Sequence, residues 1–426
     1  MKLTIGNIRI TDIVLGAQSK VENGTLFVNP KDVEALVLED SNIVSVSFDV
    51  AKPGESTRIT PVKDVIEPRT KADGSGGMFP GVVGKVDTVG SGVTHVLKGA
   101  AVVTVGKIVG FQEGIIDMSG PGAEYTPFSQ TVNLVLDFVP RDGLTAHEYE
   151  KSLRLAGLKA ASFLGDLAKN VKPDEEIVYE FLSVTEGIKK YPGLPRVGYV
   201  QMLQSQGLLH DTYVYGVDMK QSLTTMISPT EVFDGAIISG NCVSACDKNT
   251  TYHHQNNPVV TDLFARHGVD LNFAGMIITN ENVYLADKIR SSDWTAKLAE
   301  MMGFDGVIIS QEGFGNPDTD LIMNCKKVEA KGIHTVIITD EYAGRDGTSQ
   351  SLADVDVSAN AVVTGGNANE VITLPKMDKV IGSQKYVDVI AGGFDNNTNP
   401  DGSIVVEIQA IIGATNEMGF NKMSAR

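Results

Sequence analysis

Residues 306–339, GVIISQEGFGNPDTDLIMNCKKVEAKGIHTVIIT, decide the fold class of this chain. The apolar runs at residues 306–310 and 335–339 are short and rich in Val and Ile, as buried strands are. Between them, residues 318–330 are predicted to form a helix that ends at Lys331-Gly332. A strand, a helix and a second strand in this order predict two parallel strands of one sheet.

The same rhythm extends over the chain from about residue 196 onward. Further short apolar runs lie at residues 197–203, 235–239, 273–279 and 361–364, and a second helix is predicted at residues 291–302. Buried parallel strands joined by helices produce this pattern, so we predict a doubly wound, mostly parallel sheet.

The first part of the chain has a different pattern. Strands are predicted at residues 2–10, 43–50, 100–109 and 131–138, and glycine-rich turns at residues 73–81 and 119–123. A helix then begins at Thr145, which has Glu148 at capping-box spacing. We therefore predict an α/β protein with a strand-rich N-terminal domain over residues 1–142 and an α/β domain over residues 143–426.

Composition restricts the possible functions. The chain has 426 residues, of which 42% are hydrophobic, and it can bury a large core. A net charge of −17, with no basic cluster longer than a pair, argues against a nucleic-acid partner. The apolar runs are too short for a membrane helix, and the first residues alternate like a strand rather than forming a signal peptide. Three cysteines fit a reducing compartment, so we expect a cytoplasmic protein.

Acidic and amide residues follow several of the predicted strands. They include Glu281, Glu312 and Asp340. Ligands of doubly wound sheets bind beyond the carboxyl ends of the strands, so these residues predict an acidic lip suited to an amine or a basic partner. The alternative is that they are ordinary solvated loop acids.

The stretch ISGNCVSACDKN, residues 238–249, places Asn241 directly before Cys242. A cysteine thiol can attack the preceding carbonyl and convert the amide to a thioester. Removal of the cysteine α-proton then eliminates the thioester carboxyl, and hydrolysis of the resulting dehydroalanine releases ammonia and leaves an N-terminal pyruvoyl group. Such a ketone draws electrons from a bound amine, as pyridoxal phosphate does.

Three other interpretations of this stretch remain open. Cys242 and Cys246 could bind zinc together with His253 or His254. The Asn-Cys pair also resembles the end of an intein, although Gly240 replaces the usual histidine. Finally, both cysteines could be inert small hydrophobic residues.

A second Asn-Cys pair, Asn324-Cys325, serves as an internal comparison. It falls inside the helix predicted at residues 318–330, where a regular backbone offers no strain to drive an acyl shift. The dipeptide alone is therefore not a signal for processing.

Longer stretches carry a family resemblance over essentially the whole chain. They include VGKIVGFQEGIIDMSGPGAEYTPFS at residues 105–129, DGAIISGNCVSACDKN at 234–249, SQEGFGNPDTDLIMNCKKVEAKGI at 310–333 and IITDEYAGRDGTSQSLAD at 337–354. The chain resembles the component B subunits of the glycine/sarcosine/betaine reductase family of amino-acid-fermenting anaerobes.

The resemblance implies cleavage between Asn241 and Cys242 and conversion of Cys242 to a pyruvoyl cofactor. Glycine would form an imine with this group, and a selenocysteine in a separate component B subunit would displace the amine. The carboxymethyl group left on selenium would pass to component A and then to component C, which releases acetyl phosphate. Thioredoxin would reduce the selenium centre. Sarcosine is an alternative substrate, betaine lacks the N–H that an imine needs, and an unprocessed scaffold is a further alternative.

Candidate site residues follow from the chemistry and the resemblance together. Ser239, Ser244 and Cys246 lie close enough in sequence to assist processing at Asn241 and Cys242. His253, His254 or His210 are candidates to remove the Cys242 α-proton, because histidine titrates near neutral pH. Arg345 is the candidate for binding a substrate carboxylate, and Glu312 for binding the amine. No metal is expected.

Overall fold

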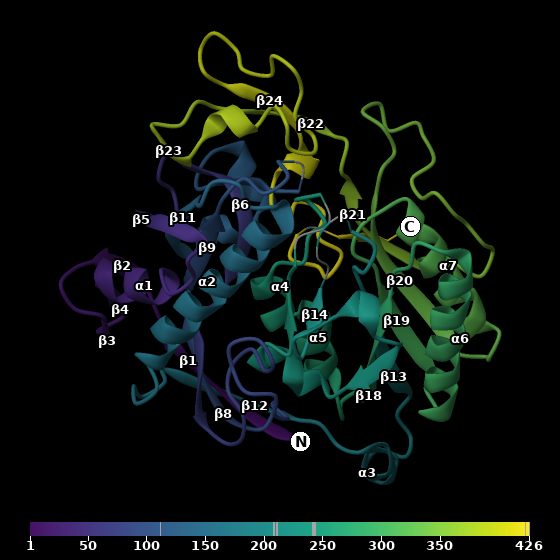
Figure 1. Ribbon diagram of the computed structural model, residues 1–426. Helices are drawn as coiled ribbons and strands as arrows, with labels where there is room; N and C mark the ends of the chain where they lie inside the picture. Colours follow the sequence, from purple (N-terminus) through teal and green to yellow (C-terminus); the bar gives the residue numbers. More distant parts are fainter. Residues whose placement is uncertain (111, 208, 210–211, 241–243, 422, 426) are drawn as a thin grey trace.

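The computed structural model describes residues 1–110, 112–207, 209, 212–240, 244–421 and 423–425. Its largest sheet has seven strands in the order β16-β18-β13-β19-β20-β21-β25 (Figure 1). The bounds are β16 Thr225–Ile227, β18 Asn272–Asn280, β13 Arg196–Leu203, β19 Gly306–Ser310, β20 His334–Glu341, β21 Val362–Asn367 and β25 Ser424–Ala425. The five central strands are parallel, and the two edge strands are antiparallel to their neighbours.

The central strands follow the order 2-1-3-4-5 when they are counted along the chain, which is a doubly wound topology. Figure 1 shows helices α6 and α7 on the outer face of this sheet, and α4 and α5 between it and the N-terminal strands. Their bounds are α4 Thr251–Gln255, α5 Pro258–Arg266, α6 Leu285–Met301 and α7 Asn316–Glu329. The predicted fold class is confirmed.

Helix α7 shows why these residues pack as they do. Leu321, Cys325 and Val328 follow each other at helical spacing and are fully buried. They belong to the same apolar cluster as Val307 and Ile337 of the adjacent strands. This apolar stripe fixes the helix against β19 and β20.

The N-terminal part contributes two sheets, with strand orders β12-β1-β8-β7 and β10-β6-β9-β11-β5; β23 also pairs with β6. The bounds are β1 Lys2–Arg9, β5 Ile43–Ala51, β6 Thr57–Ile66, β7 Arg69–Asp73, β8 Gly92–Lys98, β9 Ala100–Val105, β10 Gly114–Asp117, β11 Val132–Pro140, β12 Glu175–Glu180 and β23 Lys379–Gly382. Helix α2, Ala146–Asp166, begins with the predicted capping box of Thr145 and Glu148 and buries Leu153, Ala160 and Leu164. These residues pack in one cluster with apolar side chains of the N-terminal strands.

Smaller elements complete the chain. They are β2 Asp12–Leu15, β3 Lys20–Glu22, β4 Thr25–Val28, β14 Tyr213–Val214, β15 Val217–Asp218, β17 Ile237–Ile238, β22 Val371–Leu374, β24 Ile404–Glu407, α1 Pro30–Val37 and α3 Val184–Lys190. Short 3-10 helices occur at Pro121–Tyr125, Pro127–Gln130, Met219–Gln221, Pro229–Asp234, Gln384–Tyr386 and Ile408–Ala410.

Hydrogen bonds cross the sequence position at which we divided the chain. Strand β12 pairs with β1, and β23 pairs with β6, although β12 and β23 both come after residue 142. The division into residues 1–142 and 143–426 stays a prediction.

Two predicted elements differ from the structure. Residues 235–239 do not join the large sheet: only Ile237–Ile238 forms a strand, β17, and it pairs with β14 in a small three-stranded sheet. The prediction failed because residues 235–239 have the apolar pattern of a buried strand, whereas only the buried Ile-Ile pair forms one. Helix α6 begins at Leu285, six residues before the predicted start, because the Ser/Asp pattern taken as its first turn lies inside it.

The central strand β13 depends on a glycine. A methyl group at Gly198 would overlap the ring of Phe304. Gly198→Ala should therefore lower the free energy of unfolding by about 1 to 3 kcal/mol. Gly306→Ala in the neighbouring strand β19 is the matched control, since a Cβ there would lie 3.5 Å from the His334 carbonyl oxygen, an ordinary van der Waals distance. Urea unfolding followed by circular dichroism measures both variants, and equal losses would contradict the packing argument.

Candidate active site

The candidate site lies at the carboxyl ends of the parallel strands. Strand order reverses between β13 and β19, and open α/β sheets bind ligands at such a switch point. Glu281, Glu312 and Asp340 stand at or just after the ends of β18, β19 and β20, as predicted. All three are buried. The prediction that they form an acidic lip at the surface is therefore wrong, and so is the alternative that they are solvated loop acids. They form part of a polar interior.

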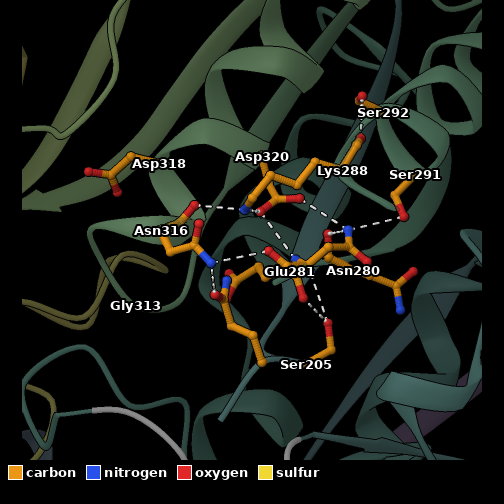
Figure 2. Close-up of polar contacts among 12 residues, drawn as sticks. Ser205, Asn280, Glu281, Lys288, Ser291, Ser292, Gly313, Asn316, Asp318 and Asp320 are labelled. Atoms are coloured by element: carbon orange, nitrogen blue, oxygen red, sulfur yellow. Dashed lines mark hydrogen bonds and ion pairs between the residues drawn. The ribbon is translucent and has the colours of Figure 1, made fainter. Parts of the chain in front are cut away.

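Figure 2 shows the polar contacts around Glu281. The Ser205 hydroxyl donates to the Glu281 carbonyl and accepts from the Glu281 backbone N–H (2.9 Å). Lys288 forms an ion pair with Asp320 and donates to the Asn316 carbonyl (2.8 Å). Lys288 of α6 therefore compensates the charge of Asp320, and its two contacts join α6 to the N-terminal end of α7.

Three buried glutamates form the centre of the site. The Asn249 backbone N–H donates to Glu312 Oε1 (2.7 Å), and the Asn249 side chain donates to Glu417 Oε1 (2.6 Å). The Glu312 backbone N–H donates to Glu281 Oε1 (3.2 Å). The second carboxyl oxygen of each glutamate is buried, and none of the described residues offers it a hydrogen-bond partner. Proteins rarely leave such atoms unsatisfied, so this cluster is unusual for a purely structural core.

Burial controls the charge of these glutamates. Burial, opposed by the hydrogen bond from the Asn249 backbone and aided by the nearby Asp247 carboxyl, raises the pKa of Glu312 to about 8. Burial also raises the pKa of Glu281 and Glu417 well above the usual range for a glutamate. The cluster therefore holds protons near neutral pH and could release them to a bound group.

Residues on both sides of the Asn-Cys junction are buried. Every residue from 231 to 240 and from 244 to 255 is buried. The Ser239 backbone N–H donates to Thr251 Oγ1 (3.1 Å), whose hydroxyl donates to Asp64 Oδ2 (2.7 Å). Asp64 Oδ1 also accepts from the Thr251 backbone N–H (2.9 Å). The Asp64 carboxylate of β6 thus binds Thr251 after the junction, and Thr251 in turn binds Ser239 before it.

The C-terminal part of the chain packs on the segment that follows the junction. The backbone N–H groups of Gly413 and Thr415 donate to the carbonyls of Ala245 (2.8 Å) and Cys246 (3.0 Å). The Asn416 side chain donates to Asn249 Oδ1 (2.7 Å). These contacts place Glu417 beside Glu312.

His253 and His254 are fully buried in α4 rather than exposed to solvent. His253 Nδ1 accepts from the Thr250 backbone N–H (3.1 Å), and its ring packs against Phe420. Burial lowers the pKa of both histidines to about 3, so both are neutral at physiological pH. The Nε2 atom of each has no hydrogen-bond partner in residues 1–110, 112–207, 209, 212–240, 244–421 and 423–425. Their role as base for Cys242 stays a prediction.

The other predicted residues divide into two groups. Asn241, Cys242 and His210 lie outside the described residues. Arg345 donates from Nε to Glu407 Oε1 (2.6 Å), lies over the Phe394 ring (4.1 Å), and keeps 58% of its side chain exposed. Glu407 already binds this guanidinium, and among the described residues Arg345 forms no ion pair with Glu281, Glu312 or Glu417. Its role in binding a carboxylate stays a prediction.

Ser244 and Cys246 are buried beside the junction. The Ser244 hydroxyl has no hydrogen-bond partner, and Cys246 Sγ lies 3.3 Å from the Tyr342 hydroxyl. Among the described residues, Cys246 groups with two carboxylates and with neither His253 nor His254. The zinc arrangement with a histidine therefore gains no support from this part of the chain.

Sequence reasoning missed several residues of the site: Asp64, Asn249, Thr251 and Glu417. Asp64 lies in a strand that is buried throughout, and Glu417 comes more than one hundred residues after Glu312. Neither position has a local pattern that marks it as part of the site.

The fold and the site define a doubly wound α/β protein with a buried, proton-holding carboxyl cluster at the switch point. A family model described as glycine/sarcosine/betaine reductase component B subunits matches residues 1–426, and the chain belongs to this family.

Three relatives match over 100% of this chain and of their own length. The chain is 66% identical to the glycine reductase complex component B subunits alpha and beta of Peptoclostridium acidaminophilum and 65% identical to those of Acetoanaerobium sticklandii. It is 56% identical to the sarcosine reductase complex component B subunit alpha of Peptoclostridium acidaminophilum. No solved structure matches the chain. None of the helices formed by the described residues has the length and apolar character needed to span a bilayer.

The raised pKa of Glu312 gives a prediction for stability. As pH rises from 4.5 to about 8, the unfolded chain gives up this proton and the folded chain keeps it, so the free energy of unfolding falls. Glu312→Gln should reduce this fall, whereas Glu176→Gln on the exposed strand β12 should not. Urea unfolding at a series of pH values tests this, and identical pH profiles for Glu312→Gln and the unsubstituted chain would contradict it.

Proposed function

We propose that this chain is the proprotein of the pyruvoyl-containing alpha and beta subunits of glycine reductase component B. Cleavage between Asn241 and Cys242 would give products of 241 and 185 residues. These correspond to roughly 26 and 20 kDa, in proportion to the 45.5 kDa of the whole chain. The observation that carries the proposal is the burial of both flanks of the junction, residues 231–240 and 244–255, which are tied together through Ser239, Thr251 and Asp64.

The surroundings of the junction suit self-processing. Burial on both sides limits the access of bulk water, which would otherwise hydrolyse a thioester before elimination. Neutral His253 and His254 each have an Nε2 atom that lacks a partner among the described residues and can accept a proton. The bond from Ser239 to Thr251 joins the described residues on the two sides of the junction.

The second Asn-Cys pair, Asn324-Cys325, serves as the internal comparison for the proposed cleavage site. Asn324 and Cys325 lie within α7, where the Asn324 side chain donates to the Asp320 carbonyl (2.9 Å). Cys325 Sγ lies 3.2 Å from Thr335 Oγ1. This pair sits in regular helix, as predicted, and is not expected to rearrange.

The buried glutamates suit an amine substrate. A pyruvoyl group supplies an electron-withdrawing carbonyl that condenses with an amine and weakens its bond to carbon. Each of Glu281, Glu312 and Glu417 has one carboxyl oxygen with no hydrogen-bond partner among the described residues, and these oxygens would accept hydrogen bonds from the substrate amine. The protonated carboxyls would supply the proton that the departing amine requires. Arg345 remains the candidate for the substrate carboxylate.

The reaction requires partners outside this chain. No selenocysteine lies in the sequence, so a separate selenocysteine-containing component B subunit would supply the attacking nucleophile. Components A and C would receive the product, thioredoxin would supply electrons, and the complex would work in the cytoplasm. The names of the relatives, which are subunits of reductase complexes, support assembly with further components.

Replacement of Cys242 tests the processing step. Cys242→Ala should abolish cleavage, the reaction of the smaller product with phenylhydrazine, and reductase activity of the reconstituted complex. Cys325→Ala, which alters the other Asn-Cys pair, should leave cleavage intact. Denaturing gels stained for the hydrazone measure both variants. A fully active Cys242→Ala complex would refute the cofactor, and an unprocessed native chain would instead support a scaffold.

Substrate choice is tested with the complete complex. Higher identity to the glycine reductase relatives than to the sarcosine reductase relative favours glycine. Ammonia release from glycine should exceed methylamine release from sarcosine by at least roughly tenfold, which corresponds to about 1.4 kcal/mol. Activity on betaine alone would contradict the amine chemistry, because betaine has no N–H.

A further inference from the structure

A second cluster of reactive side chains lies beside the glutamates but is not used in the proposed function. The Sγ atom of Cys246 and carboxylate oxygens of Asp247 and Asp340 all lie within 4.8 Å of one another. All three residues are buried, with exposed fractions of 0%, 1% and 2%. Cys246 and Asp247 belong to the segment after the junction, and Asp340 belongs to β20. The cluster thus joins two parts of the chain that are far apart in sequence.

Hydroxyl groups hold two of these side chains in place. Thr415 Oγ1 donates to Asp340 Oδ2 (2.8 Å), and the Tyr342 hydroxyl contacts Cys246 Sγ (3.3 Å). Contacts of this kind orient the ligands of metal sites and are commonly as important as the ligands themselves. These contacts hold Cys246 and Asp340 in the positions that bring the three ligand atoms together.

Asp247 provides the independent observation that a ligand belongs here. Its Oδ2 atom is buried and has no hydrogen-bond partner within the part of the chain that the structure describes, while Oδ1 lies 3.9 Å from Cys246 Sγ. A buried carboxylate oxygen without a partner is costly unless a cation or donor satisfies it. No ion pair among the described residues includes Asp247 or Asp340. The Lys248 ammonium, which adjoins Asp247 in sequence, donates to the carbonyl of Gln112 (2.7 Å).

We propose that Cys246, Asp247 and Asp340 bind a divalent transition-metal ion of borderline hardness, such as Zn²⁺. A thiolate ligand selects such ions over Mg²⁺ and Ca²⁺, which prefer oxygen alone, and carboxylates complete the set without a histidine. The ion would tie the segment after the junction to the end of β20. This goes beyond the proposed function, which uses no metal, and it differs from the Cys-His site considered from the sequence.

Cobalt binding tests the site without relying on reductase activity. The purified full-length chain is freed of metal with a chelator and titrated with Co²⁺, whose bond to a thiolate gives a near-ultraviolet charge-transfer absorption. One equivalent should produce this band, and Zn²⁺ should displace it. Cys246→Ala should abolish the band, and Cys325→Ala, which removes the other described buried thiol, should keep it.

Two further variants keep the test decisive. Thr415→Val removes only the hydroxyl that orients Asp340, and it should weaken Co²⁺ binding by roughly 10- to 100-fold even if Cys246→Ala fails to fold. Cys242→Ala should retain the band, whether or not the chain is processed. Failure to bind Co²⁺, a band that survives in Cys246→Ala, full affinity in Thr415→Val, or a band lost in Cys242→Ala would each overturn the proposal. Hydrazone formation reports on processing separately, so failure of one proposal is distinguishable from failure of the other.

Discussion

The carboxylate of Asp64 is the interaction on which the site depends. It accepts both the backbone N–H and the hydroxyl of Thr251, and this hydroxyl oxygen in turn accepts the backbone N–H of Ser239. A residue of the N-terminal sheet therefore fixes the chain on both sides of Asn241 and Cys242. Asp64 is 187 residues from Thr251 in sequence, so the segment that follows the junction is held by a distant part of the chain.

The sheets also determine what cleavage would do to the protein. Strand β13 precedes the junction, and its two neighbours, β18 and β19, follow it. Likewise, β23 follows the junction and pairs with β6 of the N-terminal part. The two products would share hydrogen-bonded sheets and a common apolar core, so neither contains a complete fold by itself. Cleavage would change one peptide bond while the glutamate cluster and the buried histidines keep their positions.

Local sequence patterns correctly predicted the elements that depend on interactions between residues close in sequence. The Val- and Ile-rich runs of β18, β19 and β20 and the capping box of α2 were correct because burial and capping act within a few residues. The strand predicted around β17 was wrong in its length and its sheet, because its pairing with β14 depends on contacts between residues far apart in sequence. The carboxyl ends of the strands were predicted correctly as the site of Glu281, Glu312 and Asp340. Their burial was not predicted, because it depends on contacts with Asn249, Thr415 and Glu417. These residues lie in segments whose proximity to the strand ends no local sequence pattern indicates.

The most direct test of the central claim is the intact mass of the polypeptides in active protein purified from its native cells. The account predicts two chains, one ending at Asn241 and one beginning at position 242 with the mass of a pyruvoyl group in place of cysteine. Both should elute together under native conditions, because β13 lies between β18 and β19. A single active chain of 45.5 kDa with an unmodified thiol at Cys242 would contradict the account.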